Sequence, residues 1–207
     1  VPPGKDGKVN PNVLVTAKLI GVTEIYKMGG AQAIAALAFG TATVPKVEKI
    51  TGPGNIFVTL AKKAVIGHVD IDMLAGPSEI LIVADDSANP TYLAADLLSQ
   101  AEHDPLACAI LITDSERVAN AVGEEIEVQL AQLPRKEIAG TSLQQAGKII
   151  LAKDMPTVIE MANLSAPEHL EIMTKAPFEI MPYIRNAGAM FLGAYSPEPL
   201  GDYYAGP

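Results

Sequence analysis

The sequence predicts an α/β fold of mostly parallel sheets with helices on both faces. Short apolar runs alternate with longer helical patterns nearly throughout the 207 residues, and this alternation is typical of strand-helix-strand units. Capping residues precede helical patterns, and glycine-rich turns follow strand-like runs. The repeated unit is too irregular for a solenoid, so an open sheet is the expected architecture.

The strand and helix patterns follow one another in chain order. Strand-like runs and the helical runs after them are expected at 24–28 and 31–39, 47–51 and 55–67, 70–75 with no helix after it, 79–85 and 90–103, and 108–113 and 115–133. Further on, we expect a helix ending near Asn163, a strand beginning near Leu170, and a buried strand from Phe191 that leads into a loop. Asn89 with Pro90, and Asp154, are typical helix starts.

A boundary between two lobes is expected near residues 74–79. Gly76 and Pro77 separate two strand-like runs there without a helix between them. The alternative is one continuous sheet in which this segment is a tight crossover.

The composition argues against several classes of function. A net charge of −9 and few aromatic residues are unsuited to a phosphate backbone or to base stacking, so we expect no nucleic-acid partner. No apolar run has the 18 or so residues that a membrane span needs, so we expect no membrane partner. One cysteine, Cys108 in a strand-like run, predicts a buried, reduced thiol and fits a cytoplasmic protein.

Three glycine-rich turns are candidate ligand sites: "GGAQ" (29–32), "GPGN" (52–55) and "GPSE" (76–79). In a parallel sheet, ligands bind at the carboxyl ends of the strands, and free N–H groups at a helix start suit an anion. Neither a G-x-G-x-x-G nor a P-loop motif is present. The alternative is that the glycines supply positive φ angles and Asn55 only caps its helix.

Polar side chains in three further stretches could carry chemistry. Gln100 and His103, in "LLSQAEHDP", are three residues apart, so on one helix they would share a face beyond its buried stripe. Glu168 and His169, in "SAPEHLEI", would supply two proton acceptors of different basicity. Asp202 stands in a loop rich in glycine and proline. The alternatives are a solvated Gln and His, a surface Glu beside a packed His, and an Asp in a turn.

The order of these motifs resembles the histidinol dehydrogenase family. The stretches that carry the resemblance are "GGAQAIAALAFGT", "GPGN", "DMLAGPSE", "DLLSQAEHDP", "SAPEHLEI" and "GDYYAGP". It implies incomplete Rossmann-like lobes, similar to those of aldehyde dehydrogenases, with a partial NAD lobe at 1–76 and a substrate and zinc lobe at 77–207. It also implies a homodimeric, NAD-linked zinc enzyme that oxidises L-histidinol to L-histidine through L-histidinaldehyde in histidine biosynthesis.

The resemblance implies a role for each candidate residue. It assigns zinc to Gln100, His103 and Asp202, activation of water to Glu168, and removal of the alcohol proton to His169. It assigns NAD binding to Gln32 and Asn55, and substrate binding to Ser78, Gln100, His103, His169 and Asp202.

Two other functions stay open from the sequence. The same motifs suit a dehydrogenase that acts on another amino alcohol, because they define proton transfer better than the pocket for an imidazole. Family members continue beyond "GDYYAGP" with a segment that supplies further zinc ligands across a dimer interface. We therefore expect the 207-residue chain to bind zinc poorly and to be inactive alone, so that it serves as a structural or nucleotide-binding piece.

Overall fold

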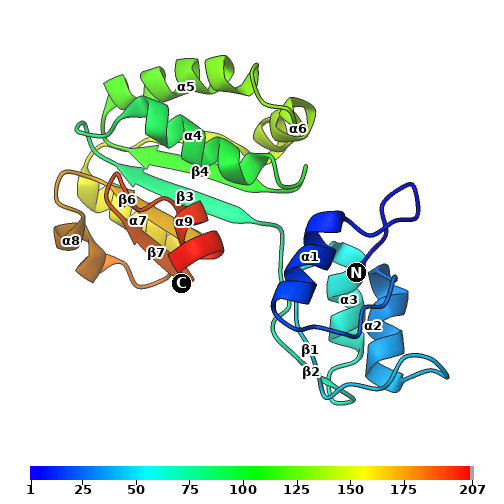
Figure 1. Ribbon diagram of the computed structural model, residues 1–207. Coiled ribbons are helices and arrows are strands. Elements are labelled where there is room, and N and C mark those ends of the chain that lie inside the picture. The colour runs from blue at the N-terminus through cyan, green and yellow to red at the C-terminus, as the bar shows by residue number, and fades with distance from the viewer. Residues whose placement is uncertain (206–207) are drawn as a thin grey trace. The chain divides into compact units, whose positions relative to one another are not determined.

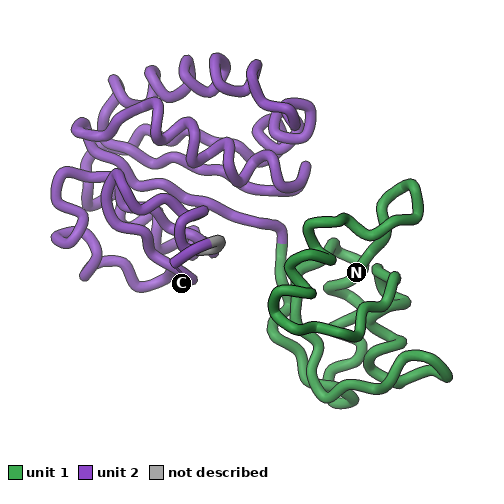
Figure 2. Tube along the Cα trace, viewed as in Figure 1, with its two compact units in different colours: residues 1–76 green, residues 77–207 purple. Residues whose placement is uncertain are grey.

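The protein consists of two compact units, residues 1–76 and 77–207 (Figure 2). The computed structural model describes residues 1–205, without the side chains of residues 202 and 203. Whether the two units act as an NAD lobe and a substrate lobe stays a prediction.

The first unit packs helices around a very small sheet (Figure 1). Its elements are α1 (Pro11–Leu19), α2 (Gly30–Phe39), β1 (Lys49–Ile50), α3 (Ile56–Ala64) and β2 (Asp70–Ile71). Strands β1 and β2 pair in parallel. Its core is formed by five buried side chains, Ile34, Ala38, Ile50, Val65 and Val69.

The strand expected at residues 24–28 is absent from this unit, because no neighbouring strand pairs with that segment. The runs at 47–51 and 70–75 contain paired strands of only two residues each. An apolar run becomes a strand only where a neighbour satisfies its backbone groups.

The second unit is a parallel five-stranded sheet with helices on both faces, which confirms the predicted fold class. Its sheet has the order β5-β4-β3-β6-β7, and every neighbouring pair is parallel. The strands are β3 (Glu79–Ala84), β4 (Cys108–Thr113), β5 (Lys148–Leu151), β6 (His169–Met173) and β7 (Ala189–Leu192). The helices are α4 (Pro90–Ala101), α5 (Glu116–Leu130), α6 (Lys136–Ala146), α7 (Met155–Ser165), α8 (Pro177–Ile180), the 3₁₀ turn η1 (Met181–Tyr183), α9 (Glu198–Leu200) and the π-helical turn η2 (Gly201–Ala205).

Alternating side chains of β3 divide the core of this unit into two layers. Ile80 and Ile82 pack with α4, α5 and α6 on one face, whereas Leu81 and Val83 pack with α7 on the other. Figure 1 shows these helices on their two sides of the sheet. Side chains of a strand alternate between faces, so each face of β3 contributes to one layer.

The expected helix caps are present at both predicted positions. The Asn89 side chain accepts a hydrogen bond from the Thr91 N–H at 3.0 Å, and Asp154 accepts one from Thr157 at 2.9 Å. Cys108 begins β4 and is a free thiol, as expected, but it is only half-buried where a buried thiol was expected. None of the described helices is long and apolar enough to cross a membrane.

Candidate functional site

The candidate catalytic residues of the second unit meet at the amino edge of its sheet. Ser78 directly precedes β3, and Glu168 directly precedes β6. The Glu79 N–H donates to Glu168 Oε2 at 3.3 Å, and His169 Nδ1 lies 3.1 Å from the Glu79 carbonyl oxygen. The pairing of β3 with β6 therefore brings together residues that are about ninety positions apart.

His169 is held in a defined orientation and tautomer. Its side chain is 11 % exposed, and Nδ1 lies 3.8 Å from Glu168 Oε2. A carbonyl oxygen can only accept, so the contact with the Glu79 carbonyl places the hydrogen on Nδ1. The neutral ring then carries its lone pair on Nε2, which is the nitrogen that can accept a proton.

The turn that presents Glu168 is tightly constrained. Ala166 ends α7 in the left-handed region, with φ 47°, and is the one non-glycine residue with positive φ among the described residues. Gly188 packs against the same turn, because a Cβ there would lie 2.6 Å from the Glu168 carbonyl oxygen. Positive φ costs an L-residue about 1 kcal/mol, so the packing around this turn holds Glu168 in place.

Gln100 and His103 are placed differently from the helical-wheel prediction. Helix α4 ends at Ala101, so His103 lies in the turn that follows it, where its N–H donates to the Gln100 carbonyl at 3.0 Å. Gln100 was expected beyond the buried stripe, but it is 1 % exposed. His103 is exposed. The reading of both as solvated side chains is therefore wrong for Gln100.

The Gln100 side chain is an unsatisfied buried amide. Neither its Oε1 nor its Nε2 has a hydrogen-bond partner among the described residues. Such a group costs about 1–3 kcal/mol when nothing compensates it. Histidine is a usual zinc ligand and an amide oxygen an uncommon one, but a cation would give the unpartnered Gln100 oxygen a partner, so these residues fit a zinc ion.

The third expected zinc ligand, Asp202, has a side chain outside the described residues. Its backbone belongs to the π-helical turn Gly201–Ala205 and not to the loop that the sequence predicted. Among the described residues, no three His, Cys, Asp or Glu side chains form a group that could hold a metal ion. The expected ligands are not such a group, because Gln100 is an amide and the Asp202 side chain lies outside the described residues.

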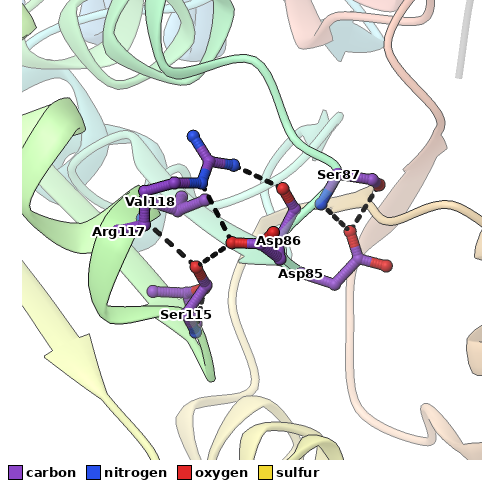
Figure 3. Close-up of polar contacts among 7 residues, drawn as sticks. Asp85, Asp86, Ser87, Ser115, Arg117 and Val118 are labelled. Carbon is purple, nitrogen blue, oxygen red and sulfur yellow. Dashed lines mark hydrogen bonds and ion pairs between the residues drawn. The ribbon is translucent and has the colours of Figure 1, made fainter.

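The opposite, carboxyl edge of the sheet was the expected place for a ligand, but its polar groups bond to one another. Asp86 follows β3 and accepts from Ser115 Oγ at 2.6 Å and from Arg117 Nε at 3.0 Å (Figure 3). Asp85 accepts from the Ser87 N–H at 2.9 Å. These contacts tie the ends of β3 and β4 to the start of α5. Glu168 and His169 lie at the amino edge of the sheet instead.

In the first unit, Gln32 lies in the first turn of α2 and is exposed. Gly30 before it has φ +74°, and a Cβ there would lie 3.0 Å from Gln32 Oε1. Glycine at this position therefore supplies the positive φ and also leaves room for the Gln32 side chain.

The "GPGN" turn of the first unit is fixed by a buried lysine. Lys62 Nζ donates to the Gly52 carbonyl at 2.6 Å and to Asp72 Oδ1. Asp72 Oδ2 accepts from the Gly52 N–H at 2.7 Å. The hydrogen bond from Lys62, followed by that from Gly52, lowers the pKa of the Asp72 carboxyl. Asn55 caps α3 by accepting from the Phe57 N–H at 3.1 Å, as its alternative reading predicts; NAD binding by Asn55 stays a prediction.

A buried carboxyl group, Glu171, and a half-buried one, Asp96, were not predicted from the sequence. Glu171 on β6 is 1 % exposed and lies on the face of the sheet that α4 covers; burial, and then the charge of Asp96 on α4, raise its pKa. The available signal was a glutamate inside the apolar strand "HLEIM", because an acidic residue in a buried strand requires a partner.

Comparisons with known proteins show the family to which this chain is similar. A family model described as histidinol dehydrogenase matches residues 1–207. The histidinol dehydrogenases of Clostridium acetobutylicum and Bacillus subtilis are 61% and 58% identical over 206 residues, which is 100% of this chain and 48% of each relative. The chain therefore spans about half the length of the curated relatives it matches.

Solved structures show the same relationship. The crystal structure of histidinol dehydrogenase from Elizabethkingia anophelis is 47% identical with a TM-score of 0.93, covering 99% of this chain and 47% of that one. A propionaldehyde dehydrogenase from Clostridium phytofermentans shares the fold alone, at 12% identity and a TM-score of 0.55 over 85% of this chain and 52% of its own. From the match over its whole length, the chain belongs to the histidinol dehydrogenase family.

Proposed function

We propose that the full-length protein is a cytoplasmic, homodimeric enzyme of histidine biosynthesis. It oxidises L-histidinol to L-histidine through L-histidinaldehyde and reduces two NAD⁺. Family membership supports the reaction. The observation that carries the proposal is the proximity of His169 and Glu168 at the amino edge of the sheet, where His169 Nδ1 lies 3.8 Å from Glu168 Oε2. This pair provides one base for each of the two oxidation steps.

In the first step, His169 is the base for the substrate hydroxyl. Its Nδ1 is committed to the Glu79 carbonyl, so Nε2 accepts the hydroxyl proton while a hydride leaves the carbon for nicotinamide. Burial of the ring and its contact with Phe191, with centroids 6.0 Å apart, hold the imidazole in one orientation. The product of this step is the aldehyde.

In the second step, Glu168 is the base for water. An aldehyde has no hydroxyl to deprotonate, so water must first add to its carbonyl carbon and lose a proton. The Glu168 side chain is 45% exposed, so water has access to it, and the Glu79 N–H holds one of its oxygens. The hydrate then transfers the hydride of its C–H bond to a second nicotinamide, which gives the carboxylate product.

Gln100, His103 and Asp202 would hold a zinc ion beside this pair. This assignment is supported by the buried Gln100 amide, which has no hydrogen-bond partner among the described residues. When bound, zinc would supply coordination for the imidazole and amine of the substrate and so orient the reacting carbon. Ser78, one residue before the Glu79 backbone that both bases contact, would bind the substrate.

Gln32 and Asn55 would bind NAD at the starts of α2 and α3. Each of these helices begins at a glycine-rich turn, and N–H groups at a helix start favour the negative charge of a pyrophosphate. The Lys62 and Asp72 contacts to Gly52 keep one of these turns in a fixed conformation.

The test is NADH formation by the full-length protein loaded with zinc. We expect two NADH per L-histidinol, and at least a hundredfold lower kcat/KM with amino alcohols that lack the imidazole. A higher kcat/KM with a simpler amino alcohol than with L-histidinol would show that the simpler alcohol is the substrate. Binding of nucleotide with no turnover of any amino alcohol would show a non-catalytic protein. The 207-residue chain alone is expected to bind zinc weakly and form no NADH.

A further inference from the structure

Glu171 is a carboxyl group in the middle of the parallel sheet. It is the third residue of β6, where it pairs with Ile82 of β3 and Phe191 of β7. Its side chain is 1 % exposed, and it lies on the same face of β6 as His169, two residues earlier. Burial of an isolated carboxylate is costly, so the contacts around Glu171 must compensate.

Two contacts occupy the carboxyl group. Oε1 accepts a hydrogen bond from the Glu198 backbone N–H at 2.8 Å. On its other side the carboxyl faces α4, because its strand neighbour Ile82 packs against that helix, and Asp96 is the carboxyl group of α4 that interacts with it. No donor among the described residues reaches Glu171 Oε2. Two carboxyl groups can bond only through a proton, so one of the pair must be protonated.

The shared proton is assigned to Glu171, because burial, and then the charge of Asp96, raise the pKa of Glu171 further than burial raises the pKa of Asp96. Glu171 therefore donates to Asp96 on the α4 side and accepts from Glu198 on the other side.

The Asp96 contact aligns Gln100 with His169. Helix α4 follows β3 and runs back towards the amino edge, as the parallel pairing of β3 with β4 requires. Gln100 lies one turn beyond Asp96, about 6 Å along the helix. His169 lies two residues before Glu171, about 6.6 Å along the strand. The two steps run in the same direction, so Gln100 and His169 lie at the same level.

The Glu198 contact fixes the segment that carries Asp202. Helix α9 begins at Glu198 and continues directly into the turn Gly201–Ala205. Gly201 packs on the ring of Phe191, because a Cβ there would lie 2.5 Å from Phe191 Cε1. The segment is thus held by Glu171 at its start and by Phe191 one turn later.

We propose that Glu171 is a positioning residue that links α4, strand β6 and the α9 segment, so that Gln100, His169 and the backbone of Asp202 are held in register. This inference rests on the proposed function for the roles of those three residues. Glu171 itself touches neither substrate nor metal in this account; it acts through Asp96 and Glu198.

The test compares four variants of the full-length protein. Glu171→Gln keeps an acceptor for Glu198 and a donor for Asp96, whereas Glu171→Leu removes both. Asp96→Ala removes only the α4 contact. Ile172→Ala, in the same strand but on the opposite face, is the control for general loss of stability. The readouts are zinc affinity, measured by competition with a chelator, and hydrogen exchange of the peptide containing Glu198 in the metal-free protein.

We expect Glu171→Leu to weaken zinc binding at least tenfold and to speed exchange at Glu198 at least tenfold, with Glu171→Gln within threefold of wild type in both. Asp96→Ala should weaken zinc binding but leave exchange at Glu198 unchanged, and it carries the test if Glu171→Leu does not fold. Ile172→Ala should change neither readout by more than threefold.

The inference is overturned if folded Glu171→Leu and Asp96→Ala bind zinc as wild type does, or if Glu171→Gln is as impaired as Glu171→Leu. Neither readout uses histidinol or NAD. A wild-type protein that shows the expected exchange and zinc results without oxidising histidinol would therefore contradict the proposed function and leave the positioning role intact.

Discussion

Replacement of Gln100 by methionine should stabilise the metal-free protein. The Gln100 amide is 1 % exposed, and neither of its polar atoms has a partner among the described residues. Each unsatisfied buried donor or acceptor costs about 1–3 kcal/mol. Methionine has about the same length and no donor to satisfy, so a volume-conserving exchange costs less than about 1.5 kcal/mol. We expect Gln100→Met to raise the free energy of unfolding by about 2 kcal/mol.

Urea denaturation in the presence of a chelator measures this gain. Ser142→Ala is the matched control, because Ser142 is also fully buried but donates to the Ala107 carbonyl at 2.9 Å. It should lose about 1 kcal/mol, the usual net value of such a bond. Added zinc should stabilise the full-length wild-type protein and leave full-length Gln100→Met unchanged, because a ligand stabilises only the state that binds it.

Gln100→Met should not destabilise the metal-free protein as Ser142→Ala does. Such a destabilisation would show that Gln100 already has its partners within the protein. The unpartnered amide would then no longer support a zinc ligand at Gln100, even if the variant were inactive.

Two further predictions concern the turns that hold the candidate residues. Gly188→Ala should cost about 1–3 kcal/mol and reduce activity at least tenfold, because its Cβ would press on the Glu168 carbonyl; unchanged unfolding and kinetics would contradict the close packing. The lowered pKa of Asp72 gives stability that is present above the ordinary carboxyl pKa near 4 and is lost as pH falls through the folded value. Asp72→Asn should therefore be less stable than wild type at pH 7, with a smaller loss between pH 4 and 2 in acid unfolding; parallel acid curves would contradict the Lys62 contact.

The sequence predicted the fold class well where local chemistry and packing agree. The apolar run at 79–85 became β3 because strands on both sides satisfy its backbone, and Asn89 and Asp154 cap helices as their residue types favour. The run at 24–28 was also expected to be a strand, but it has no neighbouring strand. The sequence of one segment does not show which distant strand it will pair with.

The candidate site was predicted only in part for the same reason. Glu168 and His169 were recognised as a pair, but their contact with Glu79 depends on the pairing of β3 with β6. The helical wheel placed Gln100 beyond the apolar stripe, yet the structure buries it. Glu171 could be recognised only by asking what a carboxyl group does inside an apolar strand.

Measuring the two half-reactions separately tests whether Glu168 and His169 act as bases in different steps. The full-length protein would be supplied with L-histidinol or with L-histidinaldehyde, and NADH formation would be followed for wild type, His169→Asn and Glu168→Gln. We expect His169→Asn to abolish oxidation of the alcohol, and Glu168→Gln to retain that step while losing oxidation of the aldehyde by a factor of 10² or more. Equal losses in both half-reactions for both variants would contradict the account.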